Sequence, residues 1–192
     1  IARFLGVPER ELEEIEYGAL PHDIGKIAIQ HDILLEPGRL DDNERELMRT
    51  HPKVGYDIVR GLKFLEGAAE IVYCHHEQPD GKGYPRGLQA DRIPVGSRII
   101  MVVDAFDAMT SDRPYRRGLA SEIAYEELRR HSGTQFFGDV VEGLIQLHST
   151  NGLFDEIDVE QLEMYTSDQY NSRILEEYVD AFVFTRFEPS GI

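Results

Sequence analysis

The sequence lacks several features that would place it in common classes of protein. It has a single cysteine, Cys74, which excludes an internal disulfide and leads us to expect a reducing, cytoplasmic location. No apolar run approaches the ~20 residues that a membrane helix needs. Residues 1–6 do not pair a basic region with an apolar one, so we expect no secretory signal there. With 20 basic against 36 acidic residues, the net charge of −16 argues against nonspecific binding of nucleic acid polymers.

What the sequence does contain is helical periodicity over most of its length. Apolar residues recur every three or four positions, whereas strict alternation is scarce, so we predict an all-α fold. The 192 residues are 41% hydrophobic, which is enough for a substantial core. Beyond Ser149 the composition shifts to acidic and aromatic residues. We therefore predict a main domain over residues 1–148 and an acidic, partly helical C-terminal extension over 149–192.

Proline and capping residues predict several helix boundaries. Pro8 is expected to open the first helix, and Pro52 to kink its segment or to start a new helix at His51. Asp139 with Glu142 resembles a capping box that opens a late helix. The remaining segments predicted from the pattern are helix 65–76, a Gly- and Pro-rich loop at 77–92, helix 95–109 and helix 121–133.

Three of the apolar faces lead into a histidine and a fourth leads into an aspartate. The histidines are His22, His51 and His75, and the apolar segment 99–103 leads into Asp104. A carboxylate in such surroundings is unfavourable unless it is paired or binds a cation. Any single one of these residues is more often a core residue with a hydrogen-bond partner. Several on inward faces of one small domain instead indicate a metal site, which helical bundles build from facing helices.

The dipeptide His-Asp occurs twice, and only the first copy follows an amphipathic helix. His31-Asp32 lies in a stretch without helical pattern, so we interpret His31 as solvated. His131 and His148 lie near predicted helix ends, where they are expected to satisfy terminal carbonyls. The candidate metal ligands that are left are His22, Asp23, His51, His75, His76 and Asp104.

The chemistry of this set limits the choice of metal. Imidazole and carboxylate together suit iron, manganese or zinc better than calcium or magnesium alone. An aspartate that lies between two metals can bridge them. Cys74 adjoins the His75-His76 pair but points about 100° away on a helix, so core packing is its predicted role.

Four segments of the sequence form an ordered series of motifs. They are HDIGK at 22–26, the helix E…M..H that ends at His51, HHEQPDGKGYP at 75–85 and IP…RI…V.DAFDAMTSDRPYR at 93–116. In this order and spacing, over about residues 1–147, the chain resembles the HD-GYP subgroup of HD-domain phosphohydrolases. The resemblance implies an all-helical domain that holds two or three divalent metal ions, iron or manganese with zinc as an alternative. It also implies hydrolysis of the bacterial messenger cyclic di-GMP to linear pGpG or GMP.

The resemblance further implies a role for individual residues. Asp23 matches a bridging metal ligand, and Lys26 matches a lysine that reaches toward the scissile phosphate, so both are catalytic candidates. The other positions that match metal ligands are His22, His51, His75, His76 and Asp104. The positions that match contacts to substrate phosphates and bases are Tyr84, Arg113 and Arg116, together with Lys26.

The basic residues of these motifs also have ordinary explanations. Arg113 and Arg116 are equally consistent with surface charge or a salt bridge, and Lys26 with a cation at a helix C-terminus. Together with Arg117, however, they form a local positive cluster that an acidic protein would need for an anionic ligand. Arginine forks match phosphate oxygens in bidentate fashion. Two metal ions would lower the pKa of a water between them and spread the charge that develops on the phosphate.

The sequence departs from the family pattern in three places. The family has a further histidine, in some members with a glutamate, on a helix before IARFLG, and this sequence starts after that point. We therefore expect one metal ligand to lie outside it. Pro21 stands where an apolar residue commonly precedes HDIGK and is expected to bend the helix that carries His22. Gln30-His31 replaces a frequent Pro-Asp, a change that we expect to be tolerated.

The sequence supports three functional hypotheses. The first is a cyclic di-GMP phosphodiesterase, the second a catalytically impaired signalling or binding module on the same fold, and the third an HD phosphohydrolase for another nucleotide. The Gly- and Pro-rich loop at 77–92 is called the GYP loop below. The expected partners are a cyclic dinucleotide and, through the GYP loop, GGDEF-type or other signalling proteins. Gly81 and Gly83 permit the turn of that loop, which is predicted to present Tyr84 beside the metal site. A homodimer formed through the extension is a further hypothesis.

Overall fold

The computed structural model describes residues 1–34, 39–112 and 117–151. Within these ranges the regular elements are helices, and the one β-type pairing is an isolated bridge between Ser132 and Phe136. The all-α prediction is therefore confirmed. The α-helices are α1 (Glu9–Ala19), α2 (His31–Leu34), α3 (Asp42–Met48), α4 (His51–Val59), α5 (Glu66–Cys74), α6 (Val95–Thr110), α7 (Ser121–Arg130) and α8 (Gly138–Asn151). The short 3₁₀ helices are η1 (Ile24–Ala28), η2 (Lys63–Leu65) and η3 (Ala90–Arg92).

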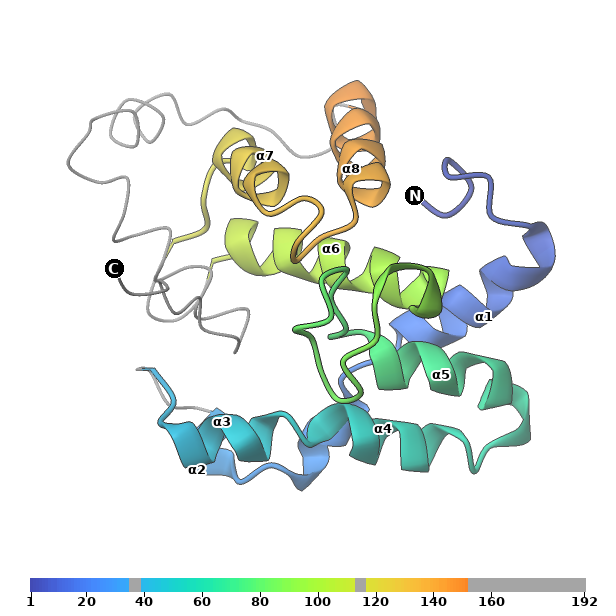
Figure 1. Cartoon of the computed structure of the whole chain (residues 1–192), viewed down its shortest axis with the longest axis vertical. Coiled ribbons are helices and arrows are strands. Elements are labelled where there is room, and N and C mark those ends of the chain that lie inside the picture. The colour runs from blue at the N-terminus through green and yellow to red at the C-terminus, as the bar shows by residue number, and fades with distance from the viewer. Residues whose placement is uncertain (35–38, 113–116, 152–192) are drawn as a thin grey trace.

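Helix α6 is the central element of the domain. It crosses the middle of Figure 1, with α7 and α8 packed on one side and α1 and α5 on the other. A helix that is apolar nearly all round must be covered on most of its surface. Consecutive buried residues such as Ile99, Ile100, Met101 and Val102 show this directly. Each such side chain contributes about 1.5–3 kcal/mol through its burial. Asp104 therefore projects from the best-anchored helix of the domain.

The candidate histidine ligands lie just after α1, at the start of α4 and just after α5. Helix α4 packs against both α5 and η1, and α1 packs against α5 (Figure 1). Helix α3 begins with a capping box between Asp41 and Glu44. A new helix then starts at His51 with Pro52 in its first turn, as predicted. The proline fits there because the first N–H groups of a helix have no intrahelical partner.

Several local predictions differ from the structure. Helix α1 ends at Ala19, so Pro21 terminates that helix and His22 lies in the following turn instead of on a bent helix. His31 begins the short helix α2, although its side chain is exposed as expected. The capping box predicted at Asp139 and Glu142 is wrong, because α8 already begins at Gly138. The Glu142 carboxylate instead pairs with Arg129 of α7, at 2.9 Å from its Nε.

The predicted boundary at residue 148 falls inside a helix. Helix α8 continues to Asn151, so the first residues assigned to the extension prolong the last helix of the domain. The rest of the predicted extension lies outside the described residues. No helix within the described ranges is long and apolar enough to cross a membrane.

Candidate metal centre

A close approach of two backbones brings Asp23 next to His51. Gly25 follows the first His-Asp dipeptide and packs directly on α4. A Cβ atom at Gly25 would lie 1.9 Å from the carbonyl oxygen of His51 and 2.6 Å from the backbone nitrogen of Gly55. Only glycine fits this contact, because any other side chain would overlap α4. The contact holds η1 against α4 and thereby places Asp23, the residue before η1, at the start of α4.

Three histidine rings are oriented by the same hydrogen bond. In each of them, Nδ1 lies within hydrogen-bond distance of the carbonyl oxygen three residues earlier in the chain. The pairs are His22 with Ala19 at 2.7 Å, His51 with Met48 at 2.7 Å and His75 with Val72 at 2.6 Å. A carbonyl can only accept, so Nδ1 donates and carries the ring proton. A ring held in this way offers its lone pair at Nε2, which is the usual way in which a protein orients a histidine ligand.

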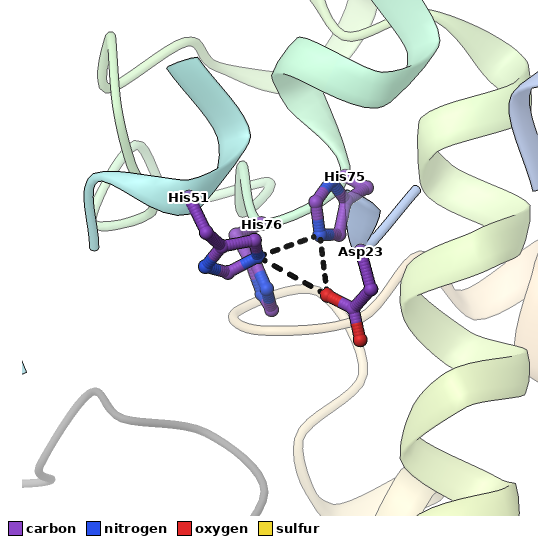
Figure 2. Close-up of side chains that lie close together, drawn as sticks. All are labelled: Asp23, His51, His75 and His76. Carbon is purple, nitrogen blue, oxygen red and sulfur yellow. Dashed lines mark hydrogen bonds and ion pairs between the residues drawn. The ribbon is translucent and has the colours of Figure 1, made fainter. Parts of the chain in front are cut away.

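The Nε2 atoms of two of these rings converge on one carboxylate oxygen. Asp23 Oδ1 lies 3.2 Å from His51 Nε2 and 3.8 Å from His75 Nε2, and the two nitrogens are 3.2 Å apart (Figure 2). One ligand atom from His76 joins them, and the four ligand atoms lie within 4.8 Å of one another. His51 and His75 are almost fully buried. This group of Asp23, His51, His75 and His76 is called the four-residue cluster below.

The donor set of the four-residue cluster fits a metal ion. Two unprotonated Nε2 atoms and a carboxylate oxygen all direct electron pairs into the same small space, which is unfavourable without a positive charge between them. The buried atoms Asp23 Oδ1 and His22 Nε2 have no hydrogen-bond partner among the described residues. Divalent cations would satisfy these atoms, and imidazole with carboxylate is a ligand set for iron, manganese or zinc.

The second oxygen of Asp23 faces a different group of residues. His22 Nε2 lies 3.6 Å from Asp23 Oδ2 and 3.9 Å from Asp104 Oδ1. Lys26 Nζ lies 2.6 Å from the same Oδ2 atom, so the lysine bonds to Asp23 within the site. Asp23 therefore stands between two sets of donors. The four-residue cluster surrounds Oδ1, and His22, Asp104 and Lys26 lie on the side of Oδ2.

Burial and neighbouring charges set the protonation of these groups. Burial lowers the pKa of His75 to about 3 and lowers the pKa of His76 well below its ordinary value, so both rings are neutral near pH 7. Burial alone would raise the pKa of Asp23, but the ammonium of Lys26, through its charge and its hydrogen bond to Oδ2, holds that pKa below its usual range. Burial raises the pKa of Asp104. The rings are thus ready to donate lone pairs, and both carboxyl groups would gain from a nearby cation.

Tyr84 lies against the four-residue cluster and is more buried than predicted. Only 8% of its surface is exposed, and its ring stacks on His76 with centroids 4.7 Å apart. The guanidinium of Arg49 lies 5.5 Å from the centroid of the same ring. The turn before it uses Gly81 at a φ of +79°. The prediction that the loop brings Tyr84 beside the site is therefore consistent with the structure, but the ring is packed inward and does not project from the loop.

Two of the predicted substrate contacts, Arg113 and Arg116, lie outside the described residues. The adjacent Arg117 is described and exposed. The two histidines assigned to helix ends bind side chains of α7. His131 Nε2 lies 2.8 Å from Glu127 Oε1, and His148 Nδ1 hydrogen bonds with the hydroxyl of Tyr125. Cys74 is fully buried, as predicted.

Sequence reasoning missed two residues that line or support the site. Arg49 stands two positions before His51 and was not distinguishable from a surface cation by its spacing. Glu77 directly follows the doubled histidine and is 1% exposed. The position of Glu77 in the sequence indicates a supporting role, because an acid between an apolar helix and a Gly- and Pro-rich loop can accept the free N–H groups of that loop.

The fold and the site together define an all-helical domain with a candidate metal centre built from histidines and a shared aspartate. Residues 1–140 match the HD domain, and the chain belongs to the HD-domain family. The family predicted from the motifs is therefore confirmed. HD domains are metal-dependent, in agreement with the ligands that the four-residue cluster offers.

Known proteins similar to this chain are phosphodiesterases of cyclic dinucleotides. A cyclic di-GMP phosphodiesterase of Thermotoga maritima is 42% identical over 149 residues, which are 77% of this chain and 40% of that protein. A 3'3'-cGAMP-specific phosphodiesterase of Vibrio cholerae is 38% identical over 148 residues, which are 76% of this chain and 28% of that protein. This chain thus spans less than half the length of either relative.

A solved structure shares the fold. It is the crystal structure of cyclic GMP-AMP-specific phosphodiesterases of V. cholerae, with a TM-score of 0.58 and 23% sequence identity. The likeness covers 91% of this chain and 51% of that chain. At this level of identity it supports the helical architecture alone.

Proposed function

We propose that this domain is a metal-dependent phosphodiesterase that hydrolyses cyclic di-GMP to linear pGpG, GMP or both. The observation that carries the proposal is the convergence of Asp23 with three histidine rings, whose ligand atoms lie within 4.8 Å of one another. Membership of the HD-domain family supports it. The name of the Thermotoga relative, a cyclic di-GMP phosphodiesterase, supports the choice of substrate.

We propose that Asp23 is shared between two divalent ions. Its Oδ1 faces His51 and His75 at 3.2 and 3.8 Å, and its Oδ2 faces His22 at 3.6 Å. Asp104 would complete the side of His22. Iron or manganese fits this mixed set, with zinc as an alternative. Bound there, such ions supply the acidity that activates a water near neutral pH and the positive charge that stabilises the attacked phosphate.

The residues of the chain would orient the substrate around this centre. Lys26, now bonded to Asp23, is proposed to donate to the scissile phosphate when substrate is present. The Tyr84 ring, stacked on His76, is proposed as one wall of the binding site. Arg113 and Arg116 are proposed as phosphate contacts because they match the family positions, and they lie outside the described residues. Each hydrolysis adds water across one phosphodiester bond, so that the phosphorus gains the hydroxyl and the leaving ribose oxygen gains the proton. One such step gives pGpG, and a second gives GMP.

A direct assay tests the proposal. The full protein, purified without oxygen and loaded with iron or manganese, is incubated with cyclic di-GMP, and linear products are separated by chromatography. We expect pGpG or GMP to appear with the loaded protein and to be absent after chelation. A protein that carries its metal and yields no linear product from any cyclic dinucleotide contradicts the proposal and favours the second hypothesis, a signalling or binding module without catalysis.

A second substrate is favoured by one specific observation. The V. cholerae relative that is 38% identical is specific for 3'3'-cGAMP, in which one guanine is replaced by adenine. The two cyclic dinucleotides share their phosphodiester ring and differ only in a base. Parallel measurements of kcat/KM for both, with the same metal-loaded preparation, decide between them, and a preference for 3'3'-cGAMP of tenfold or more would replace cyclic di-GMP in the proposal.

A signalling partner for the GYP loop is also a proposal. The loop offers exposed groups such as Lys82, whose side chain is 80% exposed, whereas Tyr84 is buried against His76. A GGDEF-type partner would therefore contact the outer side of the loop and not the tyrosine. Binding that is weakened by Lys82→Glu and unchanged by Tyr84→Phe would support this surface, and the reverse pattern would contradict it.

A further inference from the structure

One buried carboxylate beside the metal site binds no candidate ligand and bonds to backbone instead. Glu77, the residue after His76, is 1% exposed. Its Oε1 accepts the backbone N–H of Arg86 at 2.7 Å, and its Oε2 accepts the backbone N–H of Leu88 at 2.7 Å. A buried carboxyl group is strongly unfavourable unless such donors satisfy it. Each oxygen of Glu77 thus anchors a different residue of the GYP loop.

These two bonds close the loop onto the doubled histidine. Glu77 and its two donors bracket the segment that contains Tyr84. Within that segment the N–H of Tyr84 donates to the carbonyl of His76 at 3.1 Å. Gly83 packs so closely that a Cβ would lie 2.3 Å from the nitrogen of Gln78. The Tyr84 ring is consequently fixed parallel to the His76 ring, with an interplanar angle of 16°.

His76 needs this support more than the other histidines do. His22, His51 and His75 are each held by a backbone carbonyl at Nδ1. Among the described residues, the His76 ring makes no hydrogen bond, and it contacts the rings of His51, His75 and Tyr84. A ligand ring without a hydrogen bond keeps its orientation through packing alone. Tyr84 supplies a parallel face for that packing.

We propose that Glu77 is a positioning residue of the metal centre: through its two backbone bonds it holds Tyr84 against His76 and so fixes the orientation of the His76 ligand. The consequence for catalysis rests on the proposed function. The consequences for loop structure and for metal affinity do not depend on which substrate is hydrolysed, because they concern the residues of this chain and the metal alone.

Glu70, in α5, provides a matched control because it bonds to one of the same loop residues. It also bonds to Arg86, at 2.6 Å, but through the guanidinium instead of the backbone, and its side chain is half exposed. The guanidinium also donates to Cys74 Sγ at 2.7 Å and lies 4.7 Å from the centroid of the Tyr73 ring. An exposed ion pair of this kind contributes little to stability. Glu70→Gln therefore changes the same loop residue without releasing the segment around Tyr84.

The first test compares Glu77→Gln with Glu70→Gln in the full protein. A glutamine at 77 offers one acceptor and turns an N–H group toward the second donor, so one backbone bond is lost. We expect hydrogen exchange at the amides of Arg86 and Leu88 to accelerate roughly tenfold or more in Glu77→Gln, and within about twofold in Glu70→Gln. Manganese affinity, measured by titration, should fall about 10- to 100-fold in Glu77→Gln alone.

The second test asks whether Glu77 acts through Tyr84. In a Tyr84→Ala background, Glu77→Gln should cause little further loss of manganese affinity, because the link to His76 is already cut. Additive losses, or an unchanged affinity in Glu77→Gln despite faster exchange, would overturn the inference. If Glu77→Gln fails to fold, Tyr84→Ala alone still decides: it should weaken manganese binding, and unchanged affinity would contradict the role of the stack.

Activity then separates the two proposals. If metal affinity and amide exchange change as expected while no cyclic dinucleotide is hydrolysed, the proposed function fails and the positioning role stands. If hydrolysis is observed and neither amide exchange nor metal affinity responds to Glu77→Gln, the positioning role fails and the proposed function stands.

Discussion

The dipeptides His22-Asp23 and His31-Asp32 have the same sequence and lie close together in the chain, but their surroundings in the structure differ. Asp23 lies among three histidine rings and one lysine. His31 and Asp32 are exposed on the short helix α2. The dipeptide itself therefore carries little information about metal binding. The surroundings that the following residues create decide its role.

The difference begins one or two residues after each dipeptide. After the first, Gly25 allows η1 to touch the backbone of α4 at His51. After the second comes Ile33, a buried side chain that joins the small apolar cluster of Ile29, Leu40 and Met48. The contact of Gly25 with α4 places the first dipeptide next to another helix. Burial of Ile33 leaves the second dipeptide exposed to solvent.

The largest expected effect is the loss of Asp23. Asp23→Ala removes the carboxylate that both sets of donors face, so metal content and phosphodiesterase activity should fall together to background. Asp32→Ala should leave both unchanged. Metal analysis of the two variants, prepared side by side, is the measurement. Equal metal content in Asp23→Ala and in the unmodified protein would remove the basis for treating the two dipeptides differently.

Lys26 gives the next largest effect and separates binding from catalysis. Lys26→Met removes the ammonium that bonds to Asp23 at 2.6 Å, while it leaves every candidate metal ligand in place. We expect metal content to be retained and kcat to fall roughly 100-fold, because a donor to the scissile phosphate is lost. Steady-state kinetics and metal analysis of one preparation test this. Loss of metal in step with activity would show instead that Lys26 serves to hold Asp23.

Gly25→Ala is expected to act on stability and on the geometry of the site. The new Cβ would overlap the carbonyl oxygen of His51, so η1 must move away from α4 at a cost of about 1–3 kcal/mol. This corresponds to a Tm lower by about 2–4 °C for each kcal/mol in a domain of this size. Gly61→Ala is the control, because a Cβ there meets only the carbonyl oxygen of Ile58, at 3.4 Å. A similar Tm for both variants would disprove the role given to the contact.

The sequence indicates the candidate ligands of this site more directly than it indicates the contacts that arrange them. The helical class, the new helix at His51 and the buried Cys74 follow from periodicity, proline and apolar pattern, and each is confirmed. The close approach at Gly25 depends on a long-range contact with α4 that no local pattern encodes. Glu142 shows the same limit, because its tertiary pairing with Arg129 replaces the local capping bond that its spacing suggests. Residue types indicate which side chains can bind a metal. The orientation of those side chains depends on backbone groups that are distant in the sequence and close in the fold.

The smallest expected effect is that of His31→Ala. The ring is exposed, and alanine has a higher helix propensity than histidine, so the free energy of unfolding should change by less than about 0.5 kcal/mol. Manganese stoichiometry should stay the same, because His31 is not among the residues that converge on Asp23. Chemical denaturation and a metal titration measure the two quantities. A lower stoichiometry would mean that the second dipeptide also binds a metal ion. The two dipeptides would then differ in metal affinity, and not in whether they bind metal at all.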